Sequence, residues 1–292
     1  MKTGRIVRVV GGLILLAVFF FVMKKSVDSF DLEELNSKIT PATVTVVIQE
    51  TVTHPAVHET PEYKDPPKAT EPVEETPEID PDSPAGRAAA LGLPEPPDID
   101  IESWEYILAN GDNSIDEYVP PELVVVGTNS QTFDSRIVDS LRAMIEDTQA
   151  QGLSVFVSSG YRSYSDQAAN FIRVCNNNGV TDGKNSSGFY ITMPAGCSEH
   201  QTGLAADITD IYYPLKTSEI ENTATFQYMS QHCQEFGFIV RFPKDKEEVT
   251  GVMYEPFHFR YVGVEAAEYI TENGLCLEEF VSLYKDINKG EE

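Results

Sequence analysis

Four side chains in the C-terminal half of the chain are of the types that bind metal ions and transfer protons. His200 lies seven residues before Asp207, and Glu255 lies three residues before His258. Two imidazoles and one carboxylate would give a tetrahedral zinc ion three protein ligands and leave its fourth position open for water, as in catalytic zinc sites. A further carboxylate nearby can accept the proton of that water. The residue types alone also fit a plainer interpretation, in which the histidines are core residues and the acids lie on the surface.

The segments that carry these residues must bend to bring them to one centre. In an ideal strand, an odd offset places His200 and Asp207 on opposite faces, so we expect a bend or turn at Thr202–Gly203. Pro256 lies inside the second pair. Because proline fixes φ and lacks an N–H donor, we expect that pair in a turn or at a strand edge. The arrangement therefore differs from the helical metal-binding motif H-E-x-x-H.

The hydrophobic pattern from about residue 100 onward predicts an α+β fold. Helices are expected over residues 137–152, 164–179, 221–238, 264–274 and 276–287, and strands over residues 153–159 and 238–242. These elements do not alternate in regular βαβ units. We therefore expect a small domain with a central antiparallel sheet flanked by helices.

The N-terminal third has the composition of a membrane anchor followed by a stalk. Residues 6–23 are apolar apart from Arg8 and two glycines, and such a helix of about 27 Å just spans a hydrocarbon core of ~30 Å. We expect a single-pass transmembrane signal-anchor helix there, with residues 1–5 cytoplasmic. A cleavable signal peptide is the alternative, but no A-x-A pattern follows. Residues 24–99, rich in Pro, Thr and Glu, predict a disordered stalk, which leaves residues 100–292 as the folded domain.

The net charge limits the partners that the chain can have. It is -26 at pH 7, whereas proteins that bind phosphate backbones present clustered Lys and Arg. We therefore exclude nucleic acid and expect contact with a membrane only through the N-terminal helix. His54 and His58 are four residues apart in the stalk, where we interpret them as solvated side chains rather than metal ligands.

The chain has four cysteines, and none of them forms a C-x-x-C pair. This spacing gives no support to a zinc ribbon or a thioredoxin-type site, and four cysteines allow three pairings. We expect the disulfides Cys175–Cys197 and Cys233–Cys276, because each cysteine then has a nearby partner that flanks a loop. Four free thiols are the alternative.

Three short stretches of the expected domain resemble the signature blocks of a known enzyme family. They are SGYRSYSDQ (Ser159–Gln167), SEHQTGLAAD (Ser198–Asp207) and YEPFHFRYVG (Tyr254–Gly263). In order and spacing they resemble the blocks of the VanY-like D,D- and L,D-carboxypeptidases. The second block matches S-x-H-x-x-G-x-A-x-D at every specified position, and the third has Phe257 where the family usually has tryptophan. The resemblance covers residues 100–292 and implies a small α+β domain with a central antiparallel sheet, shared with the hedgehog signalling domain.

The resemblance also implies the composition of a metal centre, residue by residue. One zinc ion would be held by His200, Asp207 and His258. Glu255 would be the catalytic base and would later protonate the leaving amine.

Three further residues match positions that act on the substrate in the family. Arg162 is the expected electrostatic stabiliser of the substrate and of the transition state. Gln167 and Ser198 match positions that line the substrate site in relatives. A disulfide between Cys175 and Cys197 would brace the loop that is expected to border this cleft.

The resemblance implies a zinc-dependent carboxypeptidase that removes the terminal D-alanine from peptidoglycan stem peptides, with D,D specificity favoured over L,D. An endopeptidase of the same fold and a non-catalytic wall-binding module are the alternatives. Glu255, beside the three expected ligands, favours an enzyme over the binding module. With its anchor, the enzyme would be held at the cell membrane with the catalytic domain on the extracytoplasmic side, and no obligate protein partner is implied.

Overall fold

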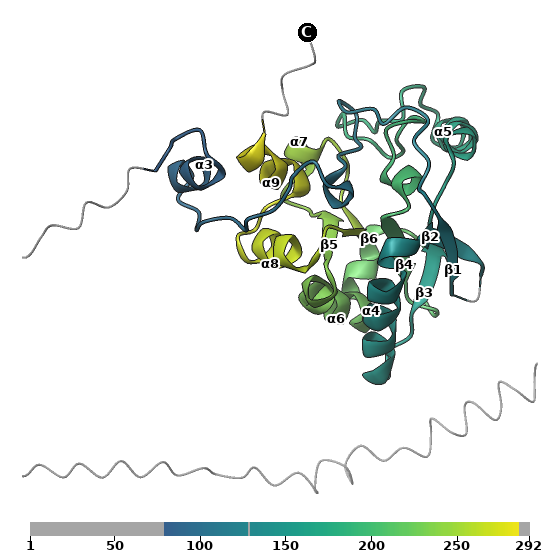
Figure 1. The fold of residues 1–292 in the computed structure, drawn as a ribbon. Coiled ribbons are helices and arrows are strands. Elements are labelled where there is room, and N and C mark those ends of the chain that lie inside the picture. Colours follow the sequence, from purple (N-terminus) through teal and green to yellow (C-terminus); the bar gives the residue numbers. More distant parts are fainter. Residues whose placement is uncertain (1–78, 128, 286–292) are drawn as a thin grey trace, which may run out of the picture. The chain divides into compact units, whose positions relative to one another are not determined.

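The chain folds around a four-stranded antiparallel sheet, with helices on its sides and a two-stranded hairpin (Figure 1). The structure is a computed structural model that describes residues 79–127 and 129–285. Its strands are β1 (Leu123–Val126), β2 (Gln131–Asp134), β3 (Phe156–Ser159), β4 (Ala205–Thr209), β5 (Phe238–Phe242) and β6 (Glu255–Tyr261). Its α-helices are α3 (Pro84–Ala90), α4 (Val138–Ala150), α5 (Tyr164–Asn178), α6 (Ala224–His232), α7 (Glu247–Thr250), α8 (Val264–Glu272) and α9 (Leu277–Tyr284). Short 3₁₀ helices are η1 (Trp104–Tyr106), η2 (Ser135–Ile137), η3 (Glu199–Thr202), η4 (Ser218–Asn222) and η5 (Cys233–Phe236).

The prediction of an α+β domain with a central antiparallel sheet is confirmed. Helices α4, α5, α8 and α9 and strands β3 and β5 lie within the predicted ranges. The segment 221–238, predicted as one helix, is divided instead. Thr223 caps α6 with its side chain, and the chain tightens into η5 after His232 before Gly237 ends it in the left-handed conformation.

The strand register separates the core from a polar face. The sheet has the order β3-β4-β6-β5 with antiparallel neighbours, and Asp207 of β4 lies directly opposite His258 of β6. Ala206 and Phe259, the adjacent residues on the same strands, belong to the hydrophobic core. Because side chains alternate along a strand, Asp207 and His258 come together on the face opposite that core.

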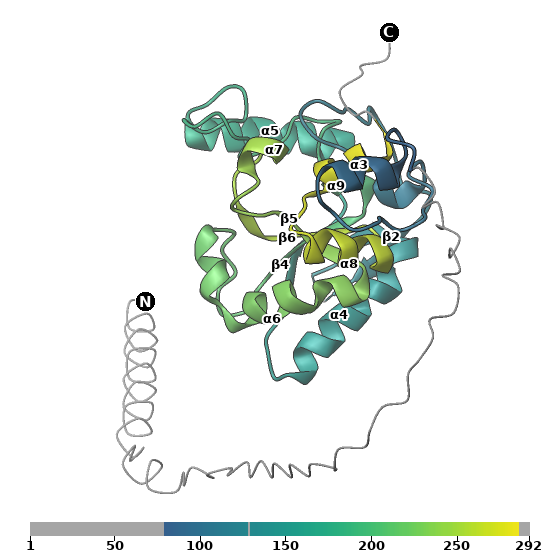
Figure 2. The same cartoon turned by 90° about the vertical axis from the view of Figure 1, so that its left-hand side faces the viewer.

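The core face of the sheet is covered by α4 and α6, which lie on the same side as α8 in Figure 2. Leu141 and Met144 of α4 and Met229 of α6 are buried there with Val157 and Phe238 from the sheet. Leu141 and Met144 are three residues apart and so share one face of their helix. Burial of each such side chain contributes about 1.5–3 kcal/mol to the stability of the fold. This packing holds the sheet in place, and the opposite face of the sheet carries the polar side chains.

The folded domain begins earlier than predicted, because the end of the expected stalk packs on the C-terminal helices. Ala88 of α3 is fully buried in a cluster with side chains of α8 and α9. The carbonyl oxygens of Pro94 and Pro97 accept hydrogen bonds at 2.8 and 2.6 Å from two tyrosine hydroxyls of these helices. The predicted stalk boundary at residue 99 is therefore wrong, since residues 79–99 belong to the domain. Proline has no N–H to satisfy, so a proline-rich segment can pack as an extended arm through its carbonyls and its apolar side chains.

A chain that begins at Asp100 should be less stable than one that begins at Ile79. The shorter chain lacks the buried side chain of Ala88 and two tyrosine hydrogen bonds. Each of these hydrogen bonds contributes about 1 kcal/mol net to stability. A loss of roughly 2 kcal/mol should lower Tm by about 4–8 °C in a domain of this size. Thermal unfolding followed by circular dichroism measures the difference. Tyr284→Phe in the longer chain should give an intermediate Tm, and equal Tm values for the two chains would contradict a stabilising arm.

The predicted N-terminal residues 1–5, the transmembrane helix over residues 6–23 and the stalk up to residue 78, with its two histidines, lie outside the described residues. Within residues 79–127 and 129–285, no helix has the length and apolar character needed to cross a membrane. The anchor and the remainder of the stalk therefore stay predictions from the sequence.

The predicted disulfides Cys175–Cys197 and Cys233–Cys276 are wrong, because all four cysteines are free thiols. Cys233 is buried in the core cluster beneath the sheet, whereas Cys276 caps the start of α9. Cys175 is buried in α5, whereas Cys197 lines the pocket described below. Burial raises the pKa of the Cys233 and Cys276 thiols to about 12, which keeps them protonated and unreactive.

Candidate metal centre and active site

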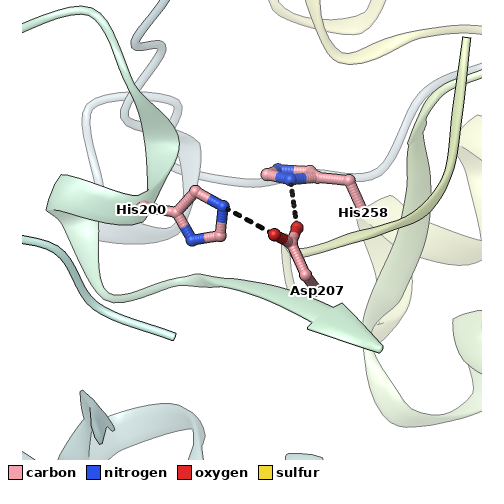
Figure 3. Close-up of side chains that lie close together, drawn as sticks. All are labelled: His200, Asp207 and His258. Atoms are coloured by element: carbon pink, nitrogen blue, oxygen red, sulfur yellow. Dashed lines mark hydrogen bonds and ion pairs between the residues drawn. The ribbon is translucent and has the colours of Figure 1, made fainter. Parts of the chain in front are cut away.

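Three potential metal ligands converge on the polar face of the sheet. Figure 3 shows His200 and His258 pointing toward the carboxylate of Asp207. His200 Nε2 lies 3.3 Å from Asp207 Oδ2, and His258 Nδ1 lies 2.9 Å from Asp207 Oδ1. One ligand atom from each residue lies within 4.8 Å of the others, and all three side chains are buried. The three residues predicted as ligands are therefore close enough to share one ion.

A turn in the backbone delivers His200 to the strands. His200 lies in η3, and Gly203, which follows this 3₁₀ helix, has a φ of 71°. A Cβ atom at Gly203 would lie 2.9 Å from the backbone nitrogen of Asp134, so both the conformation and the space require glycine. Strand β4 then carries Asp207. The bend expected at Thr202–Gly203 is thus present, and it overcomes the odd offset between the two ligands.

The outer nitrogen of each histidine is held by a hydrogen bond. His200 Nδ1 donates to the carbonyl oxygen of Gly160 at 2.8 Å. His258 Nε2 lies 3.4 Å from Oε2 of Glu199. Such contacts orient histidines that bind a metal through their other nitrogen. Two oriented imidazole nitrogens and one carboxylate oxygen form a donor set that suits zinc, so the residues present fit the ion that the sequence indicates.

The two histidines differ in protonation. Burial lowers the pKa of His200 to about 4, so its imidazole is neutral and can bind a metal. For His258, burial opposes the charged form, but hydrogen bonds to Asp207 and Glu199 prevail and raise its pKa to about 9. A proton on His258 Nδ1 must leave before that nitrogen can bind a metal ion.

Glu255 lies beside the candidate ligands at the start of β6, with Oε2 3.9 Å from His258 Nδ1. Pro256 follows as the second residue of this inner strand, so it lies at the end of a strand and not in an edge strand, where the pairing with β5 shifts register. Burial raises the pKa of Glu255 to about 7, and the Asp207 carboxylate adds to this rise. A carboxyl group that titrates near neutral pH is suited to accept a proton and to return it.

The site opens into a pocket of about 340 Å³, and Arg162, Gln167 and Ser198 all contribute to its wall. Arg162 donates to Oε1 of Gln167, and the amide of Gln167 donates to the carbonyl oxygen of Met193. Within the described ranges no carboxylate pairs with the Arg162 guanidinium. Gln167 therefore fixes Arg162 in the wall and leaves its charge available to an anionic group in the pocket.

Two residues near the ligands were not found by sequence reasoning. Lys216 Nζ lies 2.6 Å from Asp207 Oδ2 and 2.6 Å from Ser159 Oγ. It lies outside the three blocks, and no motif marks it. The sign in the sequence of a role for Glu199 is its position immediately before His200 in the second block. The arginines that it contacts lie far along the chain, so the sequence does not show this role.

Next to the metal centre lies a buried cluster of two arginines and two glutamates, here called the buried quartet: Glu199, Arg241, Arg260 and Glu278. Glu199 Oε1 accepts hydrogen bonds from Arg241 Nε at 2.7 Å and from Arg260 Nη1 at 2.8 Å. Arg241 also donates to both oxygens of Glu278, at 2.8 and 2.6 Å. Although burial opposes their ionisation, the arginines hold the pKa of both glutamates below the usual range. The quartet therefore consists of four charged side chains that compensate one another.

Two histidines and an aspartate that can share one ion, with a half-buried glutamate beside them in a pocket, form the site of a metal-dependent hydrolase. Comparison with known proteins identifies the family. Residues 130–264 match the family model described as VanY, D-alanyl-D-alanine carboxypeptidase. A D-alanyl-D-alanine carboxypeptidase of Enterococcus faecalis is 35% identical over 191 residues, which cover 64% of this chain and 69% of that protein.

Two solved structures are similar over the same part of the chain. The structure of the LdcB LD-carboxypeptidase, which concerns peptidoglycan recognition, has 32% identity and a TM-score of 0.55 and covers 62% of this chain and 86% of its own. A mutant of the vancomycin-resistance D,D-pentapeptidase VanY in complex with Zn(II) has 34% identity and a TM-score of 0.51, over 61% of this chain and 99% of its own. The chain belongs to the VanY family of D-alanyl-D-alanine carboxypeptidases. The family interpretation of the three sequence blocks is confirmed.

Proposed function

We propose that the chain is a zinc-dependent carboxypeptidase that removes the terminal D-alanine from peptidoglycan stem peptides, with D,D specificity. The observation that carries the proposal is the convergence of three metal-binding side chains beside Glu255 in a pocket that also contains Arg162. The carboxypeptidase name of the Enterococcus faecalis relative and the Zn(II) complex of VanY support the substrate and the metal.

The roles of the residues follow from their positions. His200, Asp207 and His258 would hold the zinc ion, which when bound supplies Lewis-acid polarisation of the scissile carbonyl and lowers the pKa of water. Glu255 accepts a proton from the attacking water and donates it to the amine nitrogen of D-alanine as the peptide bond breaks. Arg162 stabilises the negative charge that develops on the carbonyl oxygen and attracts the anionic end of the substrate.

The proposal is tested by product analysis of the full chain with one equivalent of zinc and with pentapeptide and tetrapeptide stems. Free D-alanine released from the pentapeptide alone, detected by mass spectrometry, is the expected result. Release from the tetrapeptide alone would make the enzyme an L,D-carboxypeptidase, and larger fragments would make it an endopeptidase. No product from a chain that binds zinc stoichiometrically would overturn the enzymatic function and favour a wall-binding module.

Removing zinc with a chelator should abolish hydrolysis, and one equivalent of zinc should restore it. The ligand side chains are buried together only in the folded state, so bound zinc should also stabilise the fold, by about 4 kcal/mol when free zinc is 1,000 times Kd. Tm with and without zinc measures this effect. His200→Ala should show no zinc-dependent rise in Tm. Full activity in a sample shown by elemental analysis to contain no metal would contradict the prediction.

We also propose that the enzyme is a single-pass membrane protein with its catalytic domain outside the cytoplasm. The apolar segment 6–23 is long enough to span a bilayer, and it precedes a segment rich in Pro, Thr and Glu that would act as a spacer. The proposed substrate, peptidoglycan, lies on the side of the membrane on which the catalytic domain is proposed to lie. Deletion of residues 1–25 should move the protein from the membrane fraction to the soluble fraction, and protease added to intact protoplasts should remove the catalytic domain. Equal membrane association of the deleted chain would contradict the anchor.

A further inference from the structure

The two candidate histidine ligands are held from outside in different ways. The outer nitrogen of His200 donates to a backbone carbonyl, whose position is fixed by the fold itself. The outer nitrogen of His258 faces the side chain of Glu199, at 3.4 Å. A side chain can rotate, so the orientation of His258 depends on what holds the carboxylate of Glu199.

Glu199 is held by the two arginines of the buried quartet. Its Oε1 accepts hydrogen bonds from both Arg241 and Arg260, which leaves Oε2 to His258. All of these side chains are at most 5% exposed. Rotation of the carboxylate would take from Arg260 its carboxylate partner and leave Arg241 with Glu278 alone, in a buried site where charges must be paired. The carboxylate is therefore fixed in position.

We propose that Glu199 is a positioning residue of the metal centre, which fixes the His258 imidazole with Nδ1 toward Asp207. The inference rests on the proposed zinc site of this enzyme. A carboxylate that accepts the outer N–H of an imidazole holds the ring and makes its other nitrogen a stronger ligand. Arg241 and Arg260 act one step further out, because they set the orientation of Glu199.

Replacing Glu199 by Gln in the full chain tests the proposal. Glutamine has nearly the same shape and its oxygen can still accept from the arginines, but its NH2 group then faces His258 Nε2 and cannot accept a hydrogen bond. We expect the affinity for zinc, measured by competition with a chromophoric chelator, to fall by about 10–100-fold. The d–d absorption of the Co(II)-loaded protein should change as well, because it reports the ligand field at His258.

Two further variants separate positioning from general stability. Glu278→Gln removes a charged partner of Arg241 but leaves the contact between Glu199 and His258, so Tm should fall while zinc affinity changes by less than about threefold. Glu235→Gln is the matched surface control, because Glu235 accepts from His232 at 2.7 Å on an exposed helix end. It should leave both zinc affinity and Tm unchanged.

Zinc affinity at the wild-type level in Glu199→Gln would overturn the proposal. So would equal losses of affinity in Glu199→Gln and Glu278→Gln, because these would show an effect of packing alone. If Glu199→Gln does not fold, Glu199→Asp keeps the charge with a shorter reach and should lose zinc affinity in a folded protein. Since the readout is metal binding, a wild-type chain that binds zinc but cleaves no stem peptide would overturn the proposed function and leave this inference intact.

Discussion

Replacing Glu255 by Gln is expected to lower kcat for a pentapeptide stem by about 10²–10⁴-fold. Glutamine occupies nearly the same space but cannot accept a proton from water. Glu255 is separate from the three candidate ligands, with 3.9 Å between its Oε2 and His258 Nδ1, so the zinc content should not change. Steady-state kinetics and elemental analysis of the same sample measure the two quantities.

Glu248→Gln provides the control for this substitution, because Glu248 is an exposed carboxylate on the neighbouring helix α7, outside the pocket wall. Its kcat should equal that of the wild type. An undiminished kcat in Glu255→Gln would remove Glu255 from the mechanism, and a joint loss of zinc and activity would make it a metal ligand instead of a base.

The pH dependence of the wild-type enzyme should report the same carboxyl group. Only the ionised form of Glu255 can act as a base, so kcat/KM should rise as the pH rises through the pKa of this residue. Burial raises that pKa to about 7. A bound cation favours the carboxylate, so the acid limb of the profile should have its midpoint at or below about 7. An acid limb of the same midpoint in Glu255→Gln would assign it to another group.

Replacing Arg241 by Met is expected to lower the free energy of unfolding by about 3–5 kcal/mol. The substitution removes the charge that Glu199 and Glu278 share and leaves two carboxylates buried at no more than 5% exposure. The remaining partners are Arg260 and His258 for Glu199 and Asn110 for Glu278, and they compensate only part of the desolvation. Urea denaturation followed by circular dichroism measures the loss.

Lys285→Met is the matched control, because it removes an ion pair with Glu102 in which both side chains are exposed. Such pairs contribute at most about 1 kcal/mol. The double variant in which Met replaces both Arg241 and Glu278 should regain part of the stability, since it removes one of the two uncompensated charges. If Arg241→Met were as stable as Lys285→Met, the buried quartet would contribute no more than a surface pair.

The parts of the fold that could be predicted are those with a local cause. Strand β5 and helices α4 and α5 have the predicted ranges because their apolar spacing decides the structure without help from distant residues. The bend at Gly203 was predicted for the same reason, since the offset between two candidate ligands required it. The convergence of His200, Asp207 and His258 was inferred from two separated blocks, and the strand register now gives its physical basis.

The parts that were missed or mistaken depend on partners far along the chain. The proline-rich arm has no regular apolar spacing and is ordered by side chains of α8 and α9, among them tyrosines 175 and 187 residues after the prolines that they contact. The expected disulfides were chosen by proximity in the sequence, but Cys233 and Cys276 belong to different elements. Glu199 has no visible role in the sequence, because its two arginines lie on β5 and β6 and become neighbours only in the sheet.

The packing of the arm on α8 and α9 has a mechanical consequence. A force that pulls the chain at residue 79 would act first on α3 and on the carbonyls of Pro94 and Pro97, which are bonded to Tyr269 and Tyr284. The load would therefore pass into the two C-terminal helices before it reached η3, β4 and β6, which carry the candidate metal ligands. The domain could bear tension from a tether at that point while its metal centre kept its geometry.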